Sequence, residues 1–127
     1  MGAYAEYGYT NFWKLYGTKI IEIDEKIITP TLQKLGITPT DKWRWDSNSI
    51  DFDTATVSGY LQILIDFEND KPVIMVYHGY PDKTHSDGTH EWICEGRICL
   101  PKNWQTSQYI KNLRKSLKEI LQTAKSR

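Results

Sequence analysis

The chain has little cysteine, no long apolar run and no excess of charge of either sign, and each absence excludes a class of protein. Two cysteines among 127 residues exclude a small scaffold held together by several disulfides. No apolar run approaches the ~20 residues that a membrane-spanning helix needs. The N-terminus also lacks the charged-then-apolar order of a secretion signal. We therefore expect a cytoplasmic protein with no membrane partner, in which both cysteines are reduced.

Charge is balanced over the whole chain but not along it. Sixteen basic residues match sixteen acidic ones, which gives no overall attraction to nucleic acid, so no nucleic-acid partner is expected. From Gln105 onward, however, Glu119 is the only acid, and it stands against the basic residues Lys111, Arg114, Lys115, Lys118, Lys125 and Arg127. This basic segment is either a solvated helix face or a surface for docking a partner.

Sequence motifs that would indicate a bound cofactor are missing as well. There is no phosphate-binding glycine loop, no dinucleotide-binding fingerprint and no HExxH metalloprotease motif. We expect no cofactor. No repeat or linker divides the chain, and its length suits one core, so residues 1–127 are expected to form a single domain.

The pattern of apolar residues predicts helices at both ends and strands between them. Residues 10–36 favour a helix, with Thr18 as a possible cap, a stop or kink at Pro30 and a terminator at Gly36. The β-like segments are 42–45, 49–53, 60–67 and 72–78. Their short connections predict an antiparallel meander.

The second half of the chain reads as a loop, an irregular segment and a last helix. Polar residues at 79–89 predict a long loop, and the cysteine-bearing segment that follows has no clear period. A helix capped by Thr106 or Ser107 then shows an apolar stripe of Ile110, Leu113, Leu117, Ile120 and Leu121. This order predicts an α+β fold with helices packed on one antiparallel sheet.

Cys99 is the residue with the clearest chemical potential. Arg97 and Lys102 lie close to it in sequence and can favour the thiolate, which is the reactive form of cysteine. The competing interpretation is burial, because Ile98 and Leu100 flank Cys99 and free cysteine is among the most buried residue types.

Two further chemistries remain open for the same region. A zinc site can draw on five potential ligands, although their spacing lacks the usual close cysteine pairs: His78, His85, His90, Cys94 and Cys99. A disulfide between Cys94 and Cys99 can form across a turn at Glu95-Gly96, but a reducing compartment argues against it.

Residues 57–121 resemble the ubiquitin-conjugating enzyme family. In that family a first helix packs on a four-stranded antiparallel meander, a histidine follows the last strand, a glycine turn and an Ile-Cys-Leu segment carry the active-site cysteine, and a tryptophan precedes the next helix. The corresponding residues here are His90, Gly96, Ile98-Cys99-Leu100 and Trp104. The pattern is most similar to the divergent prokaryotic members found in bacterial ubiquitin-like conjugation operons and antiphage, or antiviral defence, operons.

The chain departs from the eukaryotic pattern after the histidine. Glu91 and Trp92 replace the proline and asparagine of a His-Pro-Asn triplet, whose asparagine supports the oxyanion. That role is vacant or filled elsewhere, with Asn103 as a candidate. Only one helix follows the cysteine, whereas the full family fold has more.

The resemblance implies a transferase. Cys99 would receive a ubiquitin-like protein as a thioester from an activating enzyme and pass it to an amine on a target protein. His90 would shape the cysteine loop by hydrogen bonding, Trp104 would anchor it, and the first helix would meet the activating enzyme. The alternatives are a non-catalytic protein-binding module of the same fold and a small zinc-binding domain.

Overall fold

The computed structural model describes residues 2–41, 48–53, 60–84 and 90–125. The strand expected at 42–45, and His85 among the possible zinc ligands, lie outside these residues. The elements in chain order are α1 (Ala3–Ile23), the π-helix η1 (Asp24–Ile28), α2 (Thr29–Leu35), β1 (Pro39–Asp41), β2 (Ser49–Asp53), β3 (Tyr60–Glu68), β4 (Lys71–Thr84), β5 (His90–Cys99) and α3 (Ser107–Lys125).

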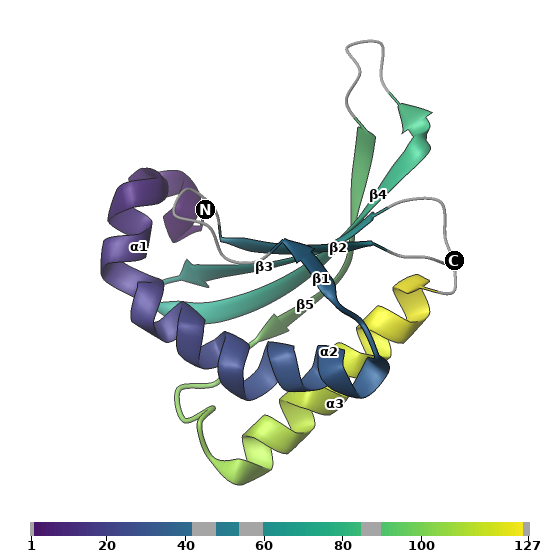
Figure 1. Cartoon of the computed structure of the whole chain (residues 1–127). Helices are drawn as coiled ribbons and strands as arrows, with labels where there is room; N and C mark the ends of the chain where they lie inside the picture. Colours follow the sequence, from purple (N-terminus) through teal and green to yellow (C-terminus); the bar gives the residue numbers. More distant parts are fainter. Residues whose placement is uncertain (1, 42–47, 54–59, 85–89, 126–127) are drawn as a thin grey trace.

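The strands form one antiparallel sheet in the order β1-β2-β3-β4-β5, so each strand pairs with its neighbour in sequence. Figure 1 shows α2 and α3 side by side beneath this sheet, with α1 on the left beside the end of β3. An α+β fold with an N-terminal helix, an antiparallel sheet and a C-terminal helix is therefore confirmed. In the described residues no helix is both long and apolar enough to cross a membrane.

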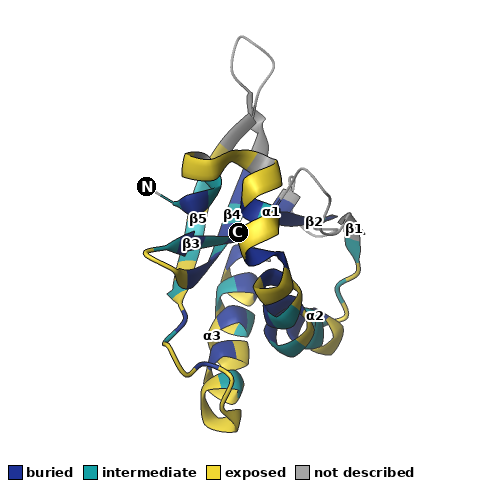
Figure 2. Cartoon of the chain, turned by 90° about the vertical axis from the view of Figure 1, so that its left-hand side faces the viewer, coloured by how far each residue is buried: buried dark blue, intermediate teal, exposed yellow. Residues whose placement is uncertain are grey.

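The core lies between the sheet and the helices, as the dark blue residues in Figure 2 show. Alternate residues of β3 are fully buried, namely Leu61, Ile63, Ile65 and Phe67. Across from them, α3 buries the leucines of its predicted stripe: Leu113, Leu117 and Leu121. The apolar residues that repeat every 2 positions in the strand thus pack in one core with those that repeat about every 3.6 positions in the helix.

The N-terminal helix begins earlier than expected, at Ala3, so Thr18 lies inside it and caps nothing. The early turns contain a kink at Gly8, whose φ is 77°. Aromatic packing holds this segment: Phe12 packs edge-on against Tyr4, with ring centroids 5.2 Å apart, and Tyr16 stacks on Phe67 at 4.0 Å. The first contact lies within α1 and the second joins α1 to β3, and an aliphatic helical period reveals neither.

Pro30 neither ends nor breaks the helix, because the preceding turn widens into η1. Proline has no N–H to donate to the carbonyl four residues earlier, which belongs to Lys26. Arg114 of α3 fills the vacancy, since its Nε donates a hydrogen bond to the Lys26 carbonyl oxygen at 2.7 Å. Gly36 ends α2 with a φ of 71°, as its sequence position predicts.

The loop predicted at 79–89 and the irregular cysteine segment are both wrong in the described residues. β4 continues to Thr84, and β5 is a strand from His90 to Cys99. The pairing shifts within β5, because Gly96 faces Val76 while Cys94 faces Tyr77, which leaves Glu95 as an extra residue. This bulge interrupts the period of 2, and that is why the strand is hidden in the sequence.

Candidate functional site

Cys99 is the last residue of β5, the strand at the edge of the sheet, and it lies opposite Val73. Its thiol is exposed and forms no disulfide. The next residue, Leu100, is only 2% exposed, and its N–H donates a hydrogen bond to the Pro72 carbonyl oxygen at 2.9 Å. The structure therefore excludes the interpretation that Cys99 is buried in the core. The thiol is exposed, and the backbone next to it is held in place by the hydrogen bond of Leu100.

The thiol opens onto a hollow of about 500 Å³ between β5 and α3. The β5 side of this hollow comprises Glu95, Arg97, Ile98 and Cys99. The α3 side comprises Ser116, Glu119, Ile120 and Thr123. We call this the thiol hollow. It brings the Cys99 thiol together with a carboxylate and two hydroxyl groups from the facing helix.

Gly96 allows α3 to lie this close to β5. A Cβ atom at position 96 would stand 2.8 Å from Cδ1 of Ile120 and 3.0 Å from its Cγ1. The turn predicted at Glu95-Gly96 is therefore wrong, since Gly96 is a strand residue whose missing side chain makes room for a helix. The same close approach brings the polar face of α3 to the thiol.

The strongest electrostatic contact near Cys99 belongs to Arg97. Its Nη2 donates a hydrogen bond to Glu68 Oε1 at 2.7 Å, reaching from β5 across β4 to the end of β3. The pKa of Arg97 is raised first by this hydrogen bond and then by the charge of Glu68, while desolvation opposes the rise. Both partners are about half exposed, so the ion pair contributes little to stability.

The structure does not bring His90 to Cys99. His90 is the first residue of β5 and Cys99 the last, which separates them by about 30 Å at about 3.3 Å per residue. Asn103 lies in the turn after β5, is exposed, and does not line the thiol hollow. Its backbone carbonyl accepts the Thr106 N–H at 3.3 Å.

Trp104 has the anchoring role expected of it. It is 5% exposed, and the ammonium of Lys26 lies 6.0 Å from the centroid of its ring. Its N–H donates to the Pro101 carbonyl oxygen at 3.1 Å. The tryptophan thus fixes the connection between β5 and α3 against the helices. Trp104 does not line the thiol hollow.

The zinc and disulfide interpretations find no support in the described part of the chain. Cys94 and Cys99 are both free, and the Cys94 thiol donates a hydrogen bond to the Gly96 carbonyl oxygen at 3.6 Å. His78 is buried within β4. Among the residues whose side chains the structure describes, which do not include His90, no group of three or more His, Cys, Asp or Glu residues is placed to hold a metal ion.

Sequence reasoning missed the helical side of the thiol hollow. Ser116, Glu119 and Thr123 follow one another at spacings of three and four residues, so they share one face of α3. The spacing was visible, but nothing in the sequence showed that this face would meet β5.

Comparisons of the chain with models of protein families, with curated proteins and with solved structures found no match.

Proposed function

We propose that the protein carries a ubiquitin-like protein as a thioester on Cys99, received from an activating enzyme and passed to an amine on a target protein. The observation that carries the proposal is the exposed thiol at the end of β5, held beside α3 and followed by a pinned Leu100. The Gly-x-Ile-Cys-Leu segment and the buried Trp104 add to it through their resemblance to ubiquitin-conjugating enzymes.

The first step is thioester exchange. The Cys99 thiolate attacks the carbonyl carbon at the modifier's C-terminus, the new carbon–sulfur bond forms, and the activating enzyme's sulfur leaves as a thiolate. This exchange is nearly balanced in energy, so the protein has mainly to position the reacting groups. An exposed thiol on a fixed backbone meets that requirement.

The second step transfers the modifier to an amine. The amine nitrogen attacks the same carbonyl carbon, an amide bond forms, Cys99 leaves as a thiolate and the amine gives up its extra proton to water. In this proposal the Glu119 carboxylate, which lines the thiol hollow, attracts the ammonium of an approaching lysine, and this ammonium gives a proton to water before its nitrogen attacks. His90 is too far away to take part, and the oxyanion role considered for Asn103 stays a prediction.

The test is a charging assay with the cognate activating enzyme, its modifier and ATP. A protein–modifier adduct that thiol reductants cleave is expected for the native chain. Cys99→Ser is expected to give an adduct that reductants leave intact, because an oxygen ester replaces the thioester. The matched control is Cys94→Ala, which removes the other exposed thiol of β5 and should leave charging unchanged. Charging of Cys99→Ala would overturn the proposal.

A second candidate is a non-catalytic protein-binding module of the same fold. One observation favours it: neither His90 nor Asn103 reaches the thiol hollow, so the thiol lacks both partners that the resemblance would give it. On this alternative the modifier or another partner binds equally well to Cys99→Ala, without any adduct. Pull-down of the same components with both proteins distinguishes the two functions.

A further inference from the structure

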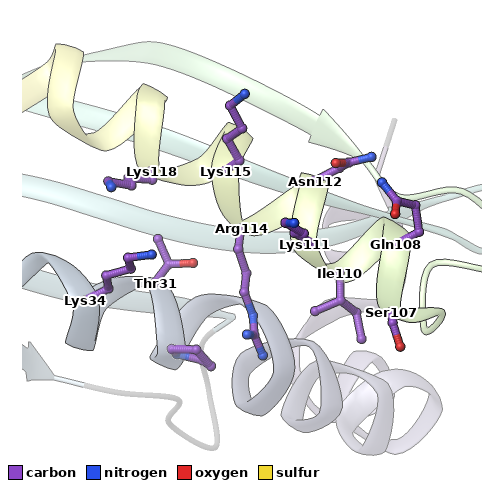
Figure 3. A pocket seen from close by; sticks show the side chains of 11 residues that line it. Thr31, Lys34, Ser107, Gln108, Ile110, Lys111, Asn112, Arg114, Lys115 and Lys118 are labelled. Atoms are coloured by element: carbon purple, nitrogen blue, oxygen red, sulfur yellow. The ribbon is translucent and has the colours of Figure 1, made fainter.

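A second hollow, of about 830 Å³, lies between α2 and α3, away from the cysteine. Pro30, Thr31 and Lys34 line it from α2. The α3 side comprises Ser107, Gln108, Ile110, Lys111, Asn112, Arg114, Lys115 and Lys118. We call it the basic groove. Figure 3 shows Lys34 and Thr31 on one helix facing Arg114 and Lys118 on the other.

The charges of the groove have one sign. Lys34, Lys111, Arg114, Lys115 and Lys118 line it, and no acidic side chain does. In the described part of the chain, the lysines of this set form no ion pair. Arg114 uses one N–H on the Lys26 carbonyl and keeps its full charge. Because the whole chain has a net charge of zero, this positive potential is local to the groove.

The groove also has a defined length and an apolar floor. The four basic residues that α3 contributes to the groove occupy positions i, i+3, i+4 and i+7, a single stripe that spans about 10 Å at about 1.5 Å per residue. Ile110 and Pro30 are half-buried and supply apolar surface between the two helices. An extended peptide covers that length with about three residues.

We propose that the basic groove binds an acidic segment of a partner protein, in which carboxylates alternate with apolar side chains. The carboxylates meet the lysines and Arg114, and the apolar side chains cover Ile110 and Pro30. Binding relieves the mutual repulsion of the groove's cations, so affinity falls as salt screens the charges. This inference is independent of the thiol chemistry, because no residue of the basic groove lines the thiol hollow.

The lining favours a peptide over a nucleic acid. Single-stranded nucleic acid is usually held by aromatic side chains on which bases stack, and no aromatic residue lines the groove. A duplex backbone is contacted over a longer basic surface than one stripe of about 10 Å. A short acidic segment fits both the length and the apolar floor.

The experiment measures fluorescence anisotropy of a fluorescein-labelled peptide of alternating glutamate and leucine, added to the folded full chain at low salt. Saturable binding is expected. The double variant Lys111→Glu/Lys115→Glu should weaken it at least tenfold, as should a rise in salt concentration. A peptide with glutamine in place of glutamate should fail to bind, which separates charge recognition from apolar adhesion.

The matched control is Lys14→Glu/Lys71→Glu, which changes net charge equally at exposed lysines outside the groove. It should bind like the native chain, and circular dichroism should show that both double variants are folded. Equal weakening in the control would overturn the proposal, since attraction would then follow net charge alone. So would displacement of the peptide by a lower concentration of single-stranded oligonucleotide. Failure of the charging assay at Cys99 would leave the proposal standing.

Discussion

At the scale of single residues, Gly96 sets how closely α3 approaches β5. A side chain there would collide with Ile120, whose Cδ1 lies 2.8 Å from the point that a Cβ atom would occupy. The nearest contacts are side-chain atoms of a half-buried isoleucine at the border of the core. A methyl group at position 96 must therefore displace Ile120, and the cost depends on how far that side chain can move.

We predict that Gly96→Ala destabilises the protein by about 1–2 kcal/mol, a typical cost of adding a methyl group to a packed contact. The collision with Ile120 is the cause, so Ile120→Ala should remove most of the added cost. Urea denaturation of both single variants and the double variant measures this coupling. Strictly additive effects would show that the collision is absent.

Tyr16 joins the N-terminal helix to the turn between β3 and β4. Its hydroxyl donates a hydrogen bond to Asp70 Oδ1 at 2.5 Å, and its ring stacks on Phe67. The hydrogen bond, followed by burial and the charge of Asp70, raises the pKa of Tyr16 from 10.0 to about 12. Between these pH values the unfolded chain has lost a proton that the folded chain keeps.

We therefore predict that Tyr16 makes stability fall as pH rises from 10 toward about 12. The unfolded state binds fewer protons over this range, so the free energy of unfolding decreases with pH. Asp70→Asn should lower the pKa of Tyr16 and flatten the dependence, and asparagine suits the φ of 62° at this position. Urea denaturation across the range measures it, with Tyr16→Phe as control. An unchanged slope in both variants would contradict the assignment.

At the scale of elements, η1 is the joint that lets a proline sit inside a continuous helical run. Pro30 has no N–H to donate to the Lys26 carbonyl, and Arg114 of α3 donates a hydrogen bond to that carbonyl at 2.7 Å. The bond ties the N-terminal helical run to the C-terminal helix at the edge of the basic groove. Pro30 thus has a structural consequence in a helix distant in sequence.

We predict that Arg114→Met lowers the free energy of unfolding by about 1 kcal/mol, the usual net value of one hydrogen bond. The loss should be smaller in a Pro30→Ala background, because alanine supplies the N–H that proline lacks. A double-mutant cycle measured by urea denaturation tests the link. An identical cost of Arg114→Met in the two backgrounds would refute it.

Elements with strong periods were predictable, and elements held by distant contacts were not. The stripe of α3 and the alternation of β3 follow from burial on one face, which the sequence displays directly. The early turns of α1 are held by Tyr4, which packs against Phe12 and whose N–H donates a hydrogen bond to Asp66 Oδ1. β5 shows no clear period in the sequence because Glu95 bulges and Gly96 makes room for a neighbouring helix rather than forming a turn.

At the scale of the whole molecule, the fold places Cys94 and Cys99 on β5, the edge strand, where both are exposed and form no disulfide. Among the described residues, neither belongs to a group that could hold a metal ion. The sequence could name Cys99 but not its surroundings. The thiol hollow depends on which face of α3 meets β5, and that is decided by the packing of the entire sheet against the helices.

We predict that iodoacetamide alkylates both cysteines of the folded protein without denaturant, because both thiols are exposed. Prior treatment with a zinc chelator should not change the rates, since the described residues offer no metal site. Intact-mass and peptide mass spectrometry report each position separately. Protection of either thiol until chelation or denaturation would contradict this arrangement.

The hydrogen bond from the Leu100 N–H to the Pro72 carbonyl oxygen restricts motion at the end of β5 that carries Cys99. With Leu100 buried and that bond formed, the backbone at Cys99 has little freedom, and the thiol retains chiefly the rotation about χ1. A group attached to the sulfur would therefore move mainly by rotation about the bonds of the Cys99 side chain, because the backbone there is fixed. A partner must therefore bind close to Cys99, because the backbone at Cys99 cannot carry the thiol toward a distant partner.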